Sequence, residues 1–462
     1  MVPMLVPRLM CTQHPDATVK ITAAEEVDEA IVAYTAYGCD EVMVDYEGKM
    51  TPYAQPKEIV VKAVRGGVPL GSKFYVTVRL PNPKLEEFDR AMLSLEAAIV
   101  ANYFSRKYAD VQAVRWVVLP MVEDVDTVML VRKMLRRKAE VYKSETGIDV
   151  GEIEVIPLME DAFVQLKVKA VLGDVFRGEE VREVRVFLGK SDSAVKHGHL
   201  ASALSIAYAL SALTQFESET GVRVRPILGM GSPPFRGALN NPRLAHLEVV
   251  QYAGYHTATI QSAVRYDTSL DEYVKVKESI LNACCAARHK VGEEVLHTIQ
   301  QASTRYRQTL LKYVDKVVEV ARLVPGTRDR VSWKEYGRSL ADGDRVVNMP
   351  RAIVYTSTWY AMGFPPTLLD APFVVELAKS DKLDDVLKVL PTYRKELEYD
   401  FEFFDPATAE KYLGGELVKA ALEAADYLGL EARPSPTYLA LLRMPRSEPN
   451  IIAMGKYRKF LG

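Results

Sequence analysis

The first 267 residues alternate between two hydrophobic patterns. Short apolar runs rich in β-branched residues each end in polar or charged residues, and an amphipathic segment with helical spacing precedes the next run. Eight β–α units in succession predict eight parallel strands, and the simplest closure is an α/β barrel of the (β/α)8 TIM type. The predicted strands are Arg8–Thr12, Glu41–Val44, Phe74–Val78, Val114–Leu119, Ile153–Leu158, Val184–Leu188, Val224–Leu228 and Thr257–Ile260.

The remaining residues have a different pattern. Leu270–Leu323 is amphipathic with helical spacing and predicts a long helical segment, which Pro325-Gly326 ends. Beyond Met349-Pro350 the pattern predicts short helices between proline-rich turns, and no strand is expected. We therefore divide the chain into a barrel over 1–267 and an all-helical extension over 268–462. The extension would pack on the barrel as one structural unit or build subunit contacts. Between the barrel strands, the predicted helices include Ala23–Tyr37, Lys84–Tyr108, Val125–Glu145 and Ala162–Leu172.

Charge and composition exclude several classes of protein. Hydrophobic residues make up 48% of the chain and charged residues 26%, as in ordinary globular proteins. The net charge is -2, which argues against a nucleic-acid-binding protein. His199–Phe216 carries no charge and is about long enough to span a bilayer, but its Ser, Thr and Ala content favours a buried helix. We expect no membrane partner.

The cysteines and the first residues bear on location. The chain has four cysteines, Cys11, Cys39, Cys284 and Cys285, without a CxxC pair. We interpret them as reduced thiols in a cytoplasmic protein. The first residues contain no long apolar core of the kind that a signal peptide has.

Ionisable residues follow several predicted strands directly. In (β/α)8 barrels the carboxyl ends of the strands carry the chemistry, because all of them open at one mouth. We therefore expect the side chains at these positions to face one another, although loops are also polar for no functional reason. The residues are His14, Glu47, Arg79, Glu160, Asp192 and, after the seventh strand, Arg236.

Glu160 and Asp192 are candidate metal ligands. They end two successive strands, which lie about 4.8 Å apart in a sheet. Two carboxylates at that spacing can share one hard divalent cation, Mg²⁺ or Mn²⁺. The alternative is that they are unrelated loop acids. The other histidines form no zinc motif.

The loop Gly229–Gly237 is a candidate anion site. Its glycines allow the backbone to approach an anion closely, and Arg236 can hold a phosphate or carboxylate with two parallel hydrogen bonds. It is not a Walker loop, since the Lys-Ser/Thr pair is missing. Together with Arg79, a carboxylate-bound metal and His14, this loop suits a phosphorylated carboxylic acid as substrate.

The motifs resemble those of the archaeal-type phosphoenolpyruvate carboxylases along nearly the whole chain. Thr12-Gln-His-Pro is similar to the Thr-Ala-His-Pro motif of the larger bacterial and plant enzymes, and Val78-Arg79 to their Ile-Arg strand end. Pro157-Leu-Met-Glu160 resembles Pro-Leu-Phe-Glu, and Gly189-Lys-Ser-Asp192-Ser resembles Gly-Tyr-Ser-Asp-Ser. Further similarities are the Gly229–Gly237 loop, Thr257-Ala-Thr-Ile-Gln261-Ser and Pro350-Arg-Ala-Ile353.

The resemblance implies a role for each matching residue. His14, Arg79 and Arg236 would be catalytic, and Glu160 and Asp192 would bind Mg²⁺ or Mn²⁺. Gly231, Gly237, Gln261 and either Lys190 or Lys196 would bind substrate. The lysine stays open because the larger enzymes place it three residues after the aspartate, whereas here Lys196 is four residues after Asp192 and Lys190 two before. Met230 and Gly363 stand where those enzymes have arginines.

The implied reaction is carboxylation of phosphoenolpyruvate by bicarbonate to oxaloacetate and phosphate, an anaplerotic step of carbon fixation. It would proceed through carboxyphosphate and an enolate without biotin. The resemblance also implies a homo-oligomer, expected as a tetramer. The alternatives are another lyase or phosphomutase barrel that handles phosphoenolpyruvate or pyruvate, and a non-catalytic barrel that binds an anion.

Overall fold

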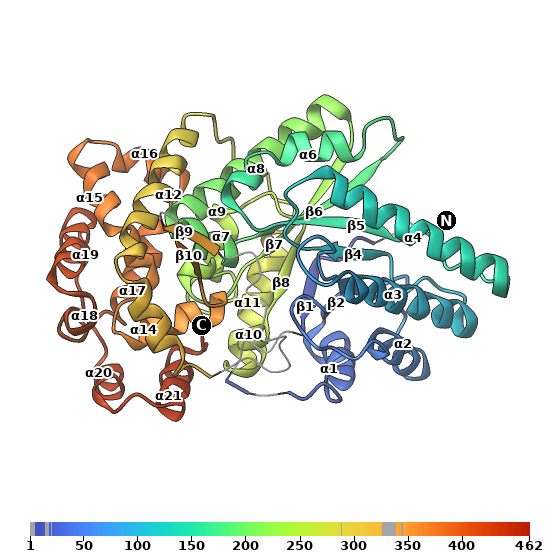
Figure 1. Ribbon diagram of the computed structural model, residues 1–462, viewed down its shortest axis with the longest axis horizontal. Helices are drawn as coiled ribbons and strands as arrows, with labels where there is room; N and C mark the ends of the chain where they lie inside the picture. Colours follow the sequence, from blue (N-terminus) through green and yellow to red (C-terminus); the bar gives the residue numbers. More distant parts are fainter. Residues whose placement is uncertain (1–4, 14–17, 20, 288, 326–338, 343–344) are drawn as a thin grey trace.

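Eight parallel strands close into a barrel at the centre of the computed structural model (Figure 1). The structure describes residues 5–13, 18–19, 21–287, 289–325, 339–342 and 345–462. Each strand lies within two residues of its prediction, so the expected α/β barrel is confirmed. The strands are β1 Leu9–Thr12, β2 Glu41–Asp45, β3 Tyr75–Arg79, β4 Trp116–Leu119, β5 Glu154–Met159, β6 Glu183–Gly189, β7 Arg223–Gly229 and β8 Thr257–Ile260.

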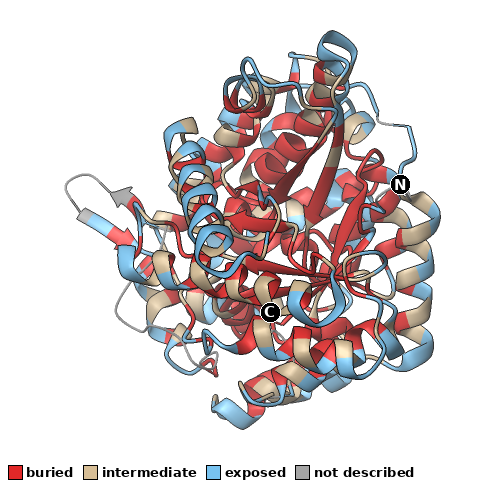
Figure 2. Cartoon of the chain, turned by 90° about the vertical axis from the view of Figure 1, so that its right-hand side faces the viewer, coloured by how far each residue is buried: buried red, intermediate tan, exposed pale blue. Residues whose placement is uncertain are grey.

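The strands are almost entirely buried, as the red ribbon in Figure 2 shows, because helices cover the outside of the barrel and side chains fill its inside. Near the amino ends of the strands, the interior holds an ion pair. Arg185 donates from Nη1 and Nη2 to the two oxygens of Glu41 at 2.9 and 2.8 Å, and its guanidinium lies 4.5 Å from the centre of the Trp116 ring. The ion pair and the ring therefore fill the interior between these strands.

Helices follow the strands as expected, with some differences in their bounds. The predicted helix Ala23–Tyr37 is an α-helix, α1, that continues into a π-helical turn at Ala33–Tyr37. The predicted helix Ala162–Leu172 is two short helices, α5 and α6. The helices of the barrel are α1 Glu26–Val32, α2 Gln55–Arg65, α3 Phe88–Ala109, α4 Val125–Thr146, α5 Ala162–Gln165, α6 Val168–Val175, α7 Ser191–His197, α8 His199–Thr220, α9 Ala245–Gln251 and α10 Ser262–Tyr266.

The uncharged segment that begins at His199 forms α8, and thirteen of its side chains are buried, as predicted for a helix packed in the interior. Among the described residues, no helix is long and apolar enough to cross a membrane.

The extension lies on one side of the barrel and differs from its prediction in two ways. Leu270–Leu323 is three helices rather than one, because the chain leaves the helix at Cys284 and takes a positive φ at Cys285. Ser339–Asp342 (β9) and Arg345–Asn348 (β10) pair as an antiparallel hairpin, so the extension over 268–462 is not all-helical, whereas beyond Met349-Pro350 the chain forms helices as expected. The helices are α11 Leu270–Ala283, α12 Val295–Leu311, α13 Val314–Ala321, α14 Ala352–Ala361, α15 Ala371–Lys379, α16 Leu383–Val389, α17 Tyr393–Phe401, α18 Pro406–Leu413, α19 Gly415–Leu428, α20 Pro436–Arg443 and α21 Glu448–Arg458.

Two of the four cysteines form a disulfide, which corrects the interpretation of all four as reduced thiols. Cys11 on β1 is bonded to Cys39, which precedes β2, with their Cα atoms 5.9 Å apart. Parallel pairing of β1 with β2 brings the two residues together, although 28 positions separate them in sequence. Cys284 and Cys285 are free.

Candidate active site

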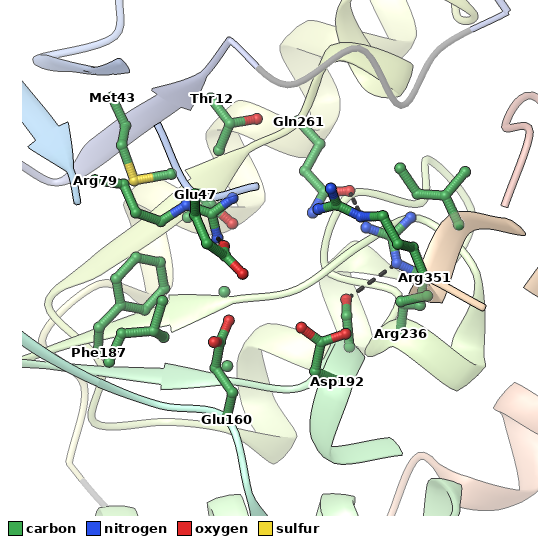
Figure 3. Close-up of a pocket in the computed structure, with 17 residues that line it drawn as sticks. Thr12, Met43, Glu47, Arg79, Glu160, Phe187, Asp192, Arg236, Gln261 and Arg351 are labelled. Carbon is green, nitrogen blue, oxygen red and sulfur yellow. Dashed lines mark hydrogen bonds and ion pairs between the residues drawn. The ribbon is translucent and has the colours of Figure 1, made fainter. Parts of the chain in front are cut away.

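A cavity of about 110 Å³ lies where the strands end. It is smaller than the ~300–1,000 Å³ of pockets that take drug-sized ligands, so it suits a small molecule. Figure 3 shows acidic and basic side chains that face one another across it. The residues that line it are Thr12, Met43, Glu47, Arg79, Leu158, Glu160, Phe187, Gly189, Ser191, Asp192, Gly229, Arg236, Thr259, Gln261, Arg351, Ala352 and Ile353.

Three carboxylates meet in this cavity. Glu160 follows β5, Asp192 lies in the first turn of α7 after β6, and Glu47 follows β2. One ligand oxygen from each lies within 4.8 Å of those of the other two (Figure 3). The sequence placed Glu47 at the mouth but did not assign it to the metal site. The reason is that β2 is not a neighbour of β5 or β6, so only the closed barrel brings the three together.

The burial and the acidic surroundings of Glu160 are those expected of a cation ligand. Its side chain is buried, and its Oε2 accepts no hydrogen bond from the described residues. Burial raises the pKa of Glu160 well above its usual value, and the nearby Glu47 and Asp192 raise it further. A divalent cation would relieve both the burial of charge and the repulsion. Three carboxylates are the hard oxygen donors that Mg²⁺ and Mn²⁺ prefer, so the residues present fit such an ion.

Arg79 ends β3 and binds two carboxylates. Its Nε and Nη2 donate to the two oxygens of Asp45 at 2.9 and 2.8 Å, and its Nη1 lies 2.7 Å from Oε2 of Glu47. Asp45 and Arg79 are direct partners in the pairing of β2 with β3, which fixes this arrangement. Burial alone would lower the pKa of Arg79, but Asp45 and Glu47 outweigh it and raise that pKa, so Arg79 remains a cation.

Arg236 enters the cavity from the loop after β7. Its Nε donates to Oγ of Ser191 at 3.0 Å, its Nη2 to Oε1 of Gln261 at 3.2 Å, and its Nη1 to the carbonyl oxygen of Gly462. A Cβ atom on Gly231 would lie 2.9 Å from the Arg236 side chain, so this position requires glycine. Gly237 has a φ of 98°, which favours glycine there as well.

Arg351 is a cavity residue to which the sequence analysis assigned no role. It precedes α14 in the helical extension, and Figure 3 places it beside Arg236, across the cavity from Arg79. Burial lowers the pKa of Arg351, whereas Glu47 and Asp192 act in the opposite direction. The Pro350-Arg-Ala-Ile motif pointed to this residue. Because the motif lies far from the barrel in sequence, its position at the mouth could not be predicted.

Neither candidate lysine lines the cavity. Lys190 is fully buried, and its Nζ donates to the carbonyl oxygen of His199 at 3.1 Å. Burial lowers the pKa of Lys190 to about 8. Lys196 Nζ lies 3.4 Å from Oδ2 of Asp161, which also contacts His197 at 2.8 Å. Both lysine side chains therefore bind partners that do not line the cavity.

His14 lies outside the described residues. Thr12, the last residue of β1, lines the cavity, and His14 follows it by two positions. The expected catalytic role of His14 remains a prediction.

The family model and the relatives with similar sequences carry the same description. The family model "Phosphoenolpyruvate carboxylase" matches residues 6–462. A phosphoenolpyruvate carboxylase of Pyrobaculum arsenaticum is 81% identical over 99% of this chain and 100% of its own length. One of Methanosarcina barkeri is 31% identical over 97% of this chain and 93% of its own. A solved structure of Haloferax volcanii malate synthase aligns over 92% of this chain and all of its own, at 12% identity with a TM-score of 0.45.

Proposed function

This chain belongs to the phosphoenolpyruvate carboxylase family, and from that premise we propose how the mouth of its barrel performs the reaction. It is an enzyme whose substrates are phosphoenolpyruvate and bicarbonate. The observation that carries the proposal is the meeting of three carboxylates and three arginines in one small cavity. The carboxylates suit a metal, and the arginines suit the phosphoryl and carboxylate groups of the substrate.

Enzymes of this family use a divalent metal, and we assign Glu160 and Asp192 to hold Mg²⁺ or Mn²⁺. A bound cation would neutralise charge on the carboxylate and enolate oxygens of the substrate. The cavity benefits from this neutralisation, since its three carboxyl groups already match its three guanidinium groups before an anionic substrate binds. An anionic substrate would otherwise create an excess of negative charge.

The arginines serve the first step. A bicarbonate oxygen attacks the phosphorus, the bond from phosphorus to the enol oxygen breaks, and carboxyphosphate and the enolate of pyruvate form. Arg79 and Arg236 would stabilise the charge on the transferring phosphoryl group, which is the main need of phosphoryl transfer. Arg351 would add a third cationic contact from the helical extension.

The second step needs a base and a closed site. His14 would take the proton of carboxyphosphate as it releases CO2 beside the enolate, and carbon–carbon bond formation then gives oxaloacetate. Gln261 and Gly231 would bind substrate through Arg236, which both contact, and Gly237 would bind substrate as the residue that follows Arg236 in the loop. Either Lys190 or Lys196 would take part in substrate binding from outside the cavity lining. The reaction as assigned needs no biotin.

The location and assembly of the enzyme are further parts of the proposal. A cytoplasmic location stays a prediction, without the support that reduced thiols at Cys11 and Cys39 would have given. A homo-oligomer, expected as a tetramer, is proposed from the family resemblance.

A coupled assay with malate dehydrogenase tests the reaction. We expect formation of oxaloacetate and release of phosphate that both require phosphoenolpyruvate, bicarbonate and a divalent metal. Phosphate release without dependence on bicarbonate would instead favour a lyase or phosphomutase type of reaction. Calorimetric binding of phosphoenolpyruvate without turnover would favour a non-catalytic barrel.

A further inference from the structure

Glu47 belongs to two sites at once. One of its oxygens, Oε2, is 2.7 Å from Nη1 of Arg79, and a ligand atom of the same side chain lies within 4.8 Å of those of Glu160 and Asp192. Figure 3 shows the Glu47 carboxylate between Arg79 and the other two acids. The arginine assigned to the phosphoryl group and the acids assigned to the metal therefore share a side chain.

The ion pair limits what Arg79 can bind. A guanidinium group has two edges that each present two parallel N–H donors. Asp45 occupies the edge formed by Nε and Nη2, and Glu47 occupies Nη1, which is half of the other edge. While Glu47 stays there, it competes with a phosphoryl group for the second edge of Arg79.

The acids also need Glu47. Oε2 of Glu160 is buried and accepts no hydrogen bond from the described residues, so a cation would give it a partner, an observation independent of the clustering. Mg²⁺ and Mn²⁺ bind six or so oxygens, and a third carboxylate adds charge that two ligands alone do not supply. A divalent cation therefore competes with Arg79 for Glu47.

We propose that Glu47 exchanges partners when a divalent cation binds, moving from Arg79 to the cation held by Glu160 and Asp192. This inference rests on the proposed function. The exchange frees the second edge of Arg79, so metal binding prepares Arg79 for the phosphoryl group of phosphoenolpyruvate. By thermodynamic reciprocity, an anion on Arg79 tightens metal binding by the same factor.

Titration with Mn²⁺, followed by the electron paramagnetic resonance signal of the free ion, tests the exchange without substrate or turnover. Four proteins form a double-mutant cycle: the wild type, Glu47→Gln, Arg79→Gln and the double variant. Glu47→Gln removes a ligand, so we expect its Kd for Mn²⁺ to rise about tenfold or more. An unchanged Kd in that variant would overturn the proposal.

The Arg79 variants separate exchange from simple charge. Arg79→Gln removes the competitor for Glu47, so we expect Mn²⁺ to bind about fivefold tighter or more in the wild-type background. In the Glu47→Gln background the same change should alter the Kd by less than about twofold. An equal gain in both backgrounds would mean that Arg79 acts only through its positive charge, and the exchange would be wrong.

Two further variants serve as an alternative and as a control in the titration. Arg79→Lys keeps a cation beside Asp45 but not the fork that spans two carboxylates, so it should also tighten Mn²⁺ binding if Arg79→Gln fails to fold. Glu96→Gln is the matched control, because Glu96 is a carboxylate paired with Lys138 at 2.6 Å, outside the cluster. Its Kd should match that of the wild type, and a tenfold rise there would overturn the specific role of Glu47.

The proposed function and the exchange can fail separately. Loss of bicarbonate dependence in the coupled assay would refute the reaction, whatever the Mn²⁺ titrations give. A normal carboxylase whose Glu47→Gln variant binds Mn²⁺ as the wild type does would refute the exchange alone.

Discussion

Arg236 is held by acceptors from three distant parts of the chain: the start of α7, the end of β8 and the last residue, Gly462. These contacts fix the guanidinium before substrate arrives, which lowers the entropic cost of binding an anion in one orientation. The same contacts must loosen or be shared when a phosphoryl group binds. Arg236 is therefore the residue at which substrate binding and the packing of the chain are most directly linked.

His14 and Arg236 should give different products when each is replaced. If His14 acts only after carboxyphosphate has formed, His14→Asn should still consume phosphoenolpyruvate in the presence of bicarbonate. It should release phosphate and pyruvate but little oxaloacetate, whereas Arg236→Ala should lose phosphate and oxaloacetate together. The quantity to measure is the ratio of oxaloacetate to phosphate.

A structural role for His14 would give another result. Loss of a hydrogen bond at a strand end would lower stability by about 1 kcal/mol and leave the product ratio unchanged. A slow His14→Asn enzyme that forms the two products in equal amounts would therefore contradict the assignment.

At the scale of elements, Asp370 joins the extension to the barrel. It ends the 3-10 turn Pro366–Asp370 and accepts the N–H of Leu200, in the first turn of α8, at 2.7 Å. The side chain is buried, and this burial raises the pKa of Asp370 to about 7. An ionised carboxylate at this junction is therefore unfavourable.

The pKa of Asp370 predicts a dependence of stability on pH. A folded pKa of about 7 lies above the unfolded value of about 3.9, so the contribution is complete below pH ~4 and is lost as the pH rises through 7. Asp370→Asn should reduce the fall in the free energy of unfolding between pH 5 and pH 8, by up to roughly 2.5 kcal/mol. Urea unfolding at several pH values measures this.

Asp385→Asn is the control for that experiment. Asp385 is exposed and pairs with Lys388, which lowers its pKa, so it titrates below the range of the experiment. In the Asp385→Asn variant, the free energy of unfolding should fall with pH as steeply as in the wild type. An equally steep fall in the Asp370→Asn variant would mean that other groups cause the loss of stability.

The elements of the barrel could be predicted because each has a local cause. The apolar run within Glu154–Met159 is buried on both faces, so its consecutive apolar residues are enough to predict the strand. The break at Cys284 and the β9–β10 hairpin lack such a signal, because long-range packing and a non-glycine residue with positive φ decide them. The Cys11–Cys39 bond depends on strand pairing, which cysteine spacing does not reveal.

The site could be predicted only as far as it follows the strand ends. Glu160, Asp192, Arg79 and Arg236 line the cavity because their positions follow from the barrel. The ion pair of Glu47 and the position of Arg351 depend on barrel closure and on the packing of the extension, which no local pattern encodes.

At the scale of the whole molecule, the oligomeric state is the main property that has to be measured. The amphipathic segment Leu270–Leu323 was expected to bury its apolar face in an interface or under later helices, and its apolar side chains, such as Ile280 and Ile299, pack within the chain. The proposed oligomer thus rests on family resemblance. Light scattering at micromolar concentration should give about four times the mass of the chain, and a monomer would refute it.

The position of Arg351 also affects how the family can diverge. The barrel provides the metal ligands, but a residue more than eighty positions beyond β8 completes the mouth. The intervening helices cannot vary freely, because α12 buries Ile299 and Tyr306 in the same core as α14. For protein engineers, a transplant of the barrel alone is therefore a poor starting point for a carboxylase.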